Sequence, residues 1–502
     1  MKRATLAVFL FLLCLFGTSR AGFGYDWKIG ENLNLNLRGD LTYAGKLRTQ
    51  NAYPTFVTLG SPFYVSGDAN FEKGELVNNA IMGTAELTAT VPHFTFFGRM
   101  KAFYDHAIND PDKFNVETRE HAAYNVTDAL EYYLEAKYGH FTTRLGRQIV
   151  QWGESIAPIF APGVNVVSPF FAQKASSAGY TVRDYQVPSH IGWINFEPTE
   201  GLSFELVYAP DFDPRYYLPV VGTLSSPVDV LGFGAESDMV DDQRPTKFED
   251  QQQYGGAIRM VFPSLDMFEL GLYYYHYRSR FPLMTLLHQF PPSMRVEYPE
   301  LDMVGMSFSQ VIQAFDLNLQ LNGELAYRPN DALQMDLFAP FMANVTGYKN
   351  LMPSAGGWER GNSLTWVFGG MKMFFDVLDF TPWTFQLTSV FEAYGKINLD
   401  YADDKYFTDP VATAYYTIDI PLTVSDMINN TALTLEVQGM GNIYPQKSKL
   451  HHLIFTTKAR YGDHWEALLG YDLIIGNPEQ DPGGAWMWDR DALTFKLVYY
   501  FI

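Results

Sequence analysis

The residues whose types and spacing point most clearly to a functional site are a group of polar and aromatic side chains between positions 147 and 165. Arg147 and Gln148 close one apolar-patterned segment, and Trp152 and Glu154 follow within seven residues, close enough for an ion pair between Arg147 and Glu154. Asn165, further on, suits a tight turn and is also a candidate for the constriction. Two interpretations are open. These residues latch a loop in place, or Arg147, Gln148, Trp152 and Glu154 shape a constriction that contacts a solute.

Other kinds of chemistry find little support. The single cysteine, Cys14, lies in an N-terminal apolar segment, so disulfides, haem attachment and thiolate metal sites are not expected. Acidic clusters near 236–242 and 400–409 do not match the twelve-residue calcium loop, and we expect no metal and no cofactor. No Gly-x-x-x-x-Gly-Lys and no Gly-x-Ser-x-Gly sequence occurs, and we expect no enzyme. Acidic residues outnumber basic ones by 56 to 36, which argues against nucleic acid as a partner.

The elements that would carry these residues are long strands. Apolar and polar residues alternate from Leu33 to Arg48, and the last dozen residues end in an aromatic-rich strand. The same alternation returns at 94–105, 130–137, 317–325 and 465–473. Strands of this length exceed the usual five or six residues and are typical of membrane-spanning barrels. We therefore predict an all-β fold, a single closed antiparallel transmembrane β-barrel of about 18 strands, with 16 as the alternative because 411–445 divides in two ways.

The chain ends and connections complete this interpretation. Residues 1–21 have the layout of a cleavable signal peptide, and 22–502 are expected to form the barrel. Short turns are predicted at 91–93, 138–140, 198–201, 263–266 and 461–463, and long loops near 49–80, 105–126, 151–188, 210–252, 281–300, 329–361 and 396–412. We expect the 151–188 loop to fold into or over the lumen. Strand parity would place Arg147 toward lipid, so a bulge near Gly146 is expected to return it to the lumen or rim.

The inward face of these strands carries charges of both signs. Arg99, Lys101, Glu131 and Glu135 fall on it and join the constriction candidates. Mixed signs favour neutralising wall pairs over a ring of one sign, which a highly selective ion channel would more often show. Tyr273, Tyr275 and Tyr277 also fall inward, where they either fill the interior or contact an aromatic solute.

The order of motifs resembles a known family. Arg147-Gln148 at a strand end, Trp152-Gly153-Glu154-Ser155, Gly163-Val164-Asn165 with Pro169, Val187-Pro188 and the strand from Leu202 to Tyr208 are similar to the Gram-negative outer-membrane family catalogued as domain of unknown function 1302. Ser168 stands where that family more often has Asn. The resemblance implies an outer-membrane barrel, often associated with periplasmic partners and pumps for hydrophobic compounds.

Together these features predict a channel for small or hydrophobic solutes in the outer membrane of a Gram-negative bacterium, with a role as the outer element of a multi-component transport system left open. The alternatives are a lipid-modifying enzyme of the outer membrane and a sheath for a partner polypeptide. Expected partners are outer-membrane lipid and lipopolysaccharide, the barrel assembly machinery and periplasmic transport proteins, and we expect a monomer.

Overall fold

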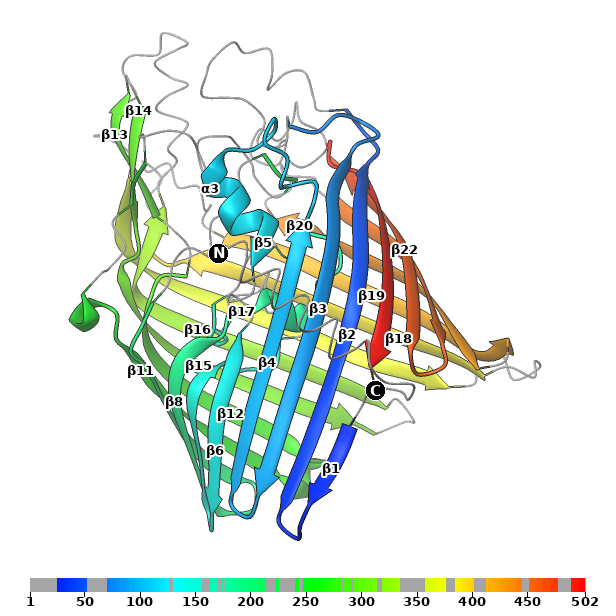
Figure 1. Ribbon diagram of the computed structural model, residues 1–502. Coiled ribbons are helices and arrows are strands. Elements are labelled where there is room, and N and C mark those ends of the chain that lie inside the picture. The colour runs from blue at the N-terminus through cyan, green and yellow to red at the C-terminus, as the bar shows by residue number, and fades with distance from the viewer. Residues whose placement is uncertain are drawn as a thin grey trace.

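A closed ring of strands forms the framework of the protein (Figure 1). The computed structural model describes residues 25–51, 70–125, 130–155, 163–169, 174, 177–212, 222–224, 240–242, 247–280, 283–289, 292–313, 318–334, 357–375, 384–400, 412–428, 430–444, 451–476 and 489–501. The expected signal peptide, 1–21, lies outside these residues. No helix in the described part of the chain is long and apolar enough to cross a membrane.

The ring contains 18 antiparallel strands, each paired with its neighbours, which confirms the predicted fold and the larger of the two strand counts. In ring order the strands are β2 (Leu33–Arg48), β3 (Leu76–Val91), β4 (Phe94–Asp105), β6 (Glu131–Tyr138), β7 (Phe141–Gln148), β8 (Ser189–Thr199), β9 (Leu202–Ala209), β11 (Gln253–Phe262), β12 (Phe268–Arg278), β15 (Glu300–Ile312), β16 (Leu319–Gln334), β17 (Trp358–Phe375), β18 (Thr384–Asn398), β19 (Ala412–Ile428), β20 (Thr431–Tyr444), β21 (His451–Tyr461), β22 (Trp465–Ile475) and β23 (Ala492–Phe501).

The two faces of the ring follow the alternation in the sequence. On β2, Tyr43 points outward and is exposed, while Thr42 and Ala44 point inward and are buried. Large apolar side chains on other strands are exposed on the outer face, and Leu145 and Leu469 are 60% and 54% exposed. Because successive residues of a strand point to opposite faces, this outer apolar row leaves the polar residues to the lumen.

The ring closes between its last and first strands. The pairing of β23 with β2 runs from Gly39 opposite Phe501 to Arg48 opposite Ala492. The remaining part of β2, Leu33–Leu37, pairs with a short additional strand, β1 (Tyr25–Ile29). β1 therefore extends the seam where β23 has already ended.

Short turns and long loops alternate between the two ends of the barrel. The predicted turns lie between β3 and β4, β6 and β7, β8 and β9, β11 and β12, and β21 and β22. The strands reach further into the long-loop end than the sequence suggested, since β3 starts at Leu76, β16 continues to Gln334 and β17 starts at Trp358. Polar residues in these extensions still form ladder pairs, so the loss of the apolar alternation did not mark the end of the strand.

Smaller elements gather at the long-loop end, shown above the ring in Figure 1. They are β5 (Tyr124–Asn125) beside β4, helix α3 (Val116–Thr118) with a π-helical turn at Arg119–Ala123, and a separate sheet of β10 (Val240–Asp242), β14 (Pro292–Glu297) and β13 (Leu283–Gln289). Helix α5 (Val182–Tyr185) lies in the connection from β7 to β8. This connection, residues 149–188, is called the crossing loop below.

Candidate functional site

The first part of the crossing loop is held by a single carboxylate of the barrel wall. Glu324 on β16 accepts hydrogen bonds at Oε1 from the backbone N–H groups of Glu154 (2.6 Å) and Ser155 (2.7 Å). Its Oε2 accepts a third from the N–H of Val164 (2.9 Å). Asn322, two residues earlier on the same inward face, donates to the carbonyl of Glu154 (2.7 Å). One wall position therefore joins two loop segments ten residues apart.

Two glycines make room for this clamp. Gly153 has φ of +82°, a conformation that favours glycine, and a Cβ there would collide with Glu324 Oε1. A Cβ at Gly163 would collide with Glu324 Oε2. The glycines of the Trp-Gly-Glu-Ser and Gly-Val-Asn segments are thus explained by the close approach of one carboxylate to the backbone.

Arginines of the wall bind the loop through its carbonyl groups. Arg328, buried on β16, donates from Nη2 to the carbonyl of Gly163 (2.7 Å), and Arg280, just after β12, donates from Nε to that of Val166 (2.8 Å). Between the two carbonyl groups that these arginines bind, the N–H of Val166 donates to the carbonyl of Val164 (3.0 Å). Asn165 therefore occupies the centre of a tight turn, as predicted.

Trp152 packs the loop against one side of the barrel. Its side chain is 1% exposed, and its ring lies 5.6 Å from that of Tyr273 and 5.5 Å from that of Tyr275. Its indole N–H donates to Glu205 (3.1 Å), which also accepts from Trp193 (2.9 Å). Valines of the loop join the same apolar cluster, which covers the wall from β8 to β16. The inward tyrosines therefore fill this side of the lumen.

A second anchor holds the far end of the loop. Asp184 in α5 is buried and accepts hydrogen bonds from Arg99 (2.6 Å) and Lys101 (2.7 Å) of β4. Although burial alone opposes ionisation, these two cations hold the pKa of Asp184 well below its usual range. The N–H and hydroxyl of Thr181 also donate to the Asp184 carboxylate, which starts the helix with a capping box.

The two anchors lie on opposite walls. Counting from β2 in the 18-stranded ring, β3 is second, β4 is third and β16 is eleventh, so the anchor strands β4 and β16 are eight strands apart, and β3 and β16 are nine apart, half the ring. The loop contacts β16 through Glu324, and it contacts the β2–β4 wall through Gly179, where a Cβ would meet Ala44 and Met82. The described parts of the loop therefore cross the lumen.

The expected bulge at Gly146, and with it a return of Arg147 to the lumen, is wrong. The ladders of β7 with β6 and β8 run without a register shift, so there is no bulge at Gly146, although that residue has φ of +145°. Arg147 stays on the outer face opposite Tyr132 and His190, at the long-loop end, where it donates to the carbonyl of Pro188 (2.9 Å). A charge is tolerated there because the cost of facing lipid falls toward the interface.

The predicted ion pair between Arg147 and Glu154 is also not formed. The Glu154 carboxyl instead lies in the lumen near Arg259, Glu269 and Glu324. Burial, followed by the repulsion of Glu269, raises the pKa of Glu154 to about 7.

The remaining candidates from the sequence lie on the inward wall. Gln148 is buried and donates to the carbonyl of Ile191 (2.8 Å). Glu131 accepts from Arg183 of the loop (2.8 Å), and Glu135 from Arg144 (2.6 Å). Thus Arg99, Lys101, Glu131, Trp152, Glu154 and Asn165 belong to the loop or its anchors, whereas Gln148 and Glu135 bond only within the wall among the described residues.

Sequence reasoning missed Glu324 as the clamp and Asp184 as the second anchor. The spacing of Thr181 and Asp184 is a helix-start signal that could have revealed α5. Nothing in the sequence around Glu324 distinguishes it from other inward acids, because its three donors come from a segment about 160 residues away.

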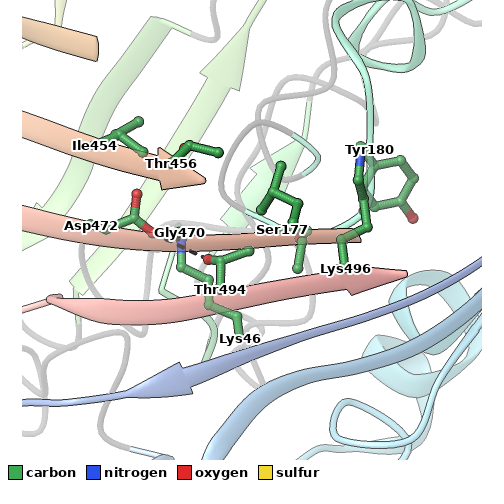
Figure 2. Close-up of a pocket in the computed structure, with 12 residues that line it drawn as sticks. Lys46, Ser177, Tyr180, Ile454, Thr456, Gly470, Asp472, Thr494 and Lys496 are labelled. Atoms are coloured by element: carbon green, nitrogen blue, oxygen red, sulfur yellow. Dashed lines mark hydrogen bonds and ion pairs between the residues drawn. The ribbon is translucent and has the colours of Figure 1, made fainter. Parts of the chain in front are cut away.

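A cavity of about 160 Å³ lies where the loop faces the β21–β23 wall and β2. Figure 2 shows Ser177 and Tyr180 of the loop facing wall residues that include Lys46, Asp472 and Lys496. Lys46 forms an ion pair with Asp472 (2.9 Å), and Lys496 forms one with Glu466 (3.1 Å).

The chain is similar in fold to several solved structures, and it matches one protein family. The crystal structure of OccAB1 from Acinetobacter baumannii is 10% identical with a TM-score of 0.44, and 93% of this chain covers 95% of it. A BenF-like porin from Pseudomonas fluorescens Pf-5 is 9% identical with a TM-score of 0.45, with coverage of 93% and 97%. No curated protein matches the chain significantly. The family described as "Protein of unknown function (DUF1302)" matches residues 2–501, and the chain belongs to it.

Proposed function

We propose that the protein is an outer-membrane channel of a Gram-negative bacterium, in which solutes pass between the crossing loop and the wall formed by β19–β23, beyond β18, where the Ser155 hydroxyl of the loop donates to Glu392 (2.9 Å). The observation that carries this proposal is the asymmetric position of the loop. Its apolar residues pack on the wall from β8 to β16, while the cavity of about 160 Å³ lies on its other side. A loop that fills one side of a closed ring narrows the lumen without needing to seal it.

The outer surface supports placement in a membrane. Leucine, phenylalanine and tyrosine side chains are exposed on the outer face of strands all around the ring. An outer apolar band with a polar interior is the arrangement of transmembrane barrels, whereas a water-soluble barrel would bury its apolar face. In this orientation the short turns face the periplasm and the long loops face outward, where lipopolysaccharide is the expected neighbour.

The charges of the interior favour a channel of weak ion selectivity. Basic and acidic side chains pair along the wall, as in Lys46 with Asp472, Lys496 with Glu466, and Arg99 with Glu86 (2.9 Å). Paired charges lower the field that one sign would impose on a passing ion. Small neutral or amphipathic solutes therefore fit this interior better than a single class of inorganic ion.

The driving force would come from a concentration gradient or a periplasmic partner. A role as the outer element of a multi-component system rests on the family resemblance and the barrel architecture, with a monomer as the working unit. The alternatives of a lipid-modifying enzyme and a sheath for a polypeptide gain no specific observation from the described residues.

The test is conductance and solute uptake by the purified protein. Reconstituted in planar bilayers it should give discrete conductance steps, and proteoliposomes containing it should swell in solutions of small sugars or amino acids. A protein that folds to a heat-modifiable barrel but gives neither conductance nor swelling would contradict the proposal.

A further inference from the structure

We propose that the cavity between the crossing loop and the β21–β23 wall is a binding subsite for small organic anions that carry an apolar ring or branched chain. The inference rests on the proposed channel function, because a solute passing beside the loop would meet this cavity. It adds a solute class and named residues to that function.

Apolar side chains interrupt the polar inner face at this point. Phe455 and Leu469 point outward and are exposed, so by alternation Ile454 and Leu468 point into the lumen, and both line the cavity. Elsewhere on these two strands the inward positions are mostly polar, for example Thr456 and Asp472, which border the same space. Two apolar side chains on a water-facing wall form a patch that suits an apolar group of a solute.

The loop supplies an aromatic surface opposite this patch. Tyr180 lines the cavity, and Figure 2 shows it on the loop side, facing the wall strands. Its ring is fixed from behind by Phe103 at 5.8 Å in an edge-on arrangement and by Lys101, whose Nζ lies 5.0 Å from the ring centre. A planar or branched apolar group would thus lie between Tyr180 and the apolar patch.

Lys496, on the cationic edge of the cavity, has hydrogen-bonding capacity left for an anion. Lys496 donates to Glu466 (3.1 Å), its one polar partner among the described residues, and an ammonium group has three donors. Lys46 lies on the same side of the cavity, and its partner Asp472 is held by His452 (3.2 Å) as well. Lys496 lines the cavity whereas its partner Glu466 does not, so a solute carboxylate at this edge would meet the ammonium group of Lys496.

The size of the cavity sets the size of the apolar group. A cavity of about 150 Å³ lined by apolar side chains accommodates a benzene ring, and the volume here is about 160 Å³. Organic cations are disfavoured by the ammonium group of Lys496, since Lys46 is paired with Asp472, and inorganic anions leave the apolar patch without a contact. An aromatic or branched monocarboxylate satisfies both surfaces.

Equilibrium binding to the detergent-solubilised full chain tests the inference directly. Phenylacetate is the probe, and uncharged 2-phenylethanol, cationic benzylamine and acetate are its comparators, measured by isothermal titration calorimetry. Phenylacetate should bind at millimolar concentrations or below, with each comparator at least about tenfold weaker, as expected for loss of a charge-assisted hydrogen bond or of apolar contact. Absence of phenylacetate binding, or equal binding of 2-phenylethanol, overturns the proposal whatever the variants show.

Lys496→Met and a matched control locate the site. Lys458 also points into the lumen, from β21 on the far side of Leu468 from Lys496, and does not itself line the cavity, so Lys458→Met removes the same charge from a neighbouring wall position. Lys496→Met should weaken phenylacetate binding about tenfold or more, Lys496→Arg should largely retain it, and Lys458→Met should leave it unchanged. Equal effects of the two methionine variants would refute the assignment.

Conductance separates this inference from the proposed function. If the protein conducts ions but does not bind phenylacetate, the channel function is supported and the subsite is contradicted. If the protein binds phenylacetate but never conducts ions, the subsite is supported as a binding site and the channel function is contradicted.

Discussion

Replacing Glu324 by glutamine should release the first anchor of the crossing loop while leaving the barrel intact. The carboxylate accepts three backbone N–H groups, and hydrogen bonds to a charged acceptor stabilise by ~1.5–3 kcal/mol each. Glutamine offers one acceptor oxygen. If it serves Glu154 and Ser155, its amide nitrogen must face the N–H of Val164, a donor opposite a donor.

The expected loss is therefore one hydrogen bond, the charge on two others and a repulsive contact, ~3–4 kcal/mol in the docking of the loop. This corresponds to a shift of roughly 100-fold or more toward the released loop. The ring should persist, because the ladders of β16 with β15 and β17 are backbone bonds that the substitution does not touch.

Hydrogen exchange and conductance measure this release together. In Glu324→Gln the amides of Glu154, Ser155 and Val164 should exchange faster, the single-channel conductance should rise, and larger sugars should swell proteoliposomes. Glu436→Gln is the matched control, since Glu436 also points inward but bonds to Gln438 (2.8 Å) and to no described loop residue. Unchanged exchange at those three amides in Glu324→Gln would refute the clamp.

Three further predictions concern the other residues of the site. Asp184→Asn should free the far end of the loop at neutral pH, seen as faster exchange in α5. In the native protein the depressed pKa of Asp184 gives stabilisation that is present at neutral pH and is lost only in acid, as the pH falls below the ordinary carboxyl value of 3.8 toward the lowered one. Glu154 acts in the opposite sense, because its raised pKa means that the docked loop is favoured when Glu154 is protonated. As the pH drops from about 7 to 4.5, docking of the loop should strengthen and the conductance should fall. Glu154→Gln should abolish this pH dependence. Arg147→Ala should leave the cation-to-anion permeability ratio unchanged, because this side chain lies on the outer face. The ratio is measured as a reversal potential under a salt gradient. A shifted reversal potential would show that Arg147 faces the pore.

The strands and their faces could be predicted because they follow from local chemistry. Alternation from Leu33 to Arg48 marks both ends of β2, and the outward parity of Leu145 correctly gives that of Arg147. The prediction for Arg147 was wrong because it included a bulge at Gly146, which was expected so that the charged side chain would not face lipid. Depth along the barrel axis decides that cost, and the alternation of the sequence does not report depth.

The crossing of the lumen could be anticipated, but its anchors could not. The Trp-Gly-Glu-Ser segment interrupts the alternation, which indicates a loop, and its aromatic residue indicates packing. Which wall receives the loop depends on the curvature that places β16 opposite β3, and this is a property of ring closure. The same applies to the pair formed by Asp184 with Arg99 and Lys101, since no spacing along the chain links α5 to β4.

The motif residues that resemble the family are mainly those that fix the loop. Trp152, Gly153 and Gly163 are in contact with the wall or with the clamp, and a solute moving past the other side of the loop would not meet them. The cavity is lined instead by Leu468, Lys496 and their neighbours on strands without a distinctive motif. Changing the solute of such a channel would require substitutions on β21–β23 with no change in the motif segments. In the proposed channel, the motif segments would fix how the lumen is narrowed, and the wall opposite the loop would determine which solutes pass.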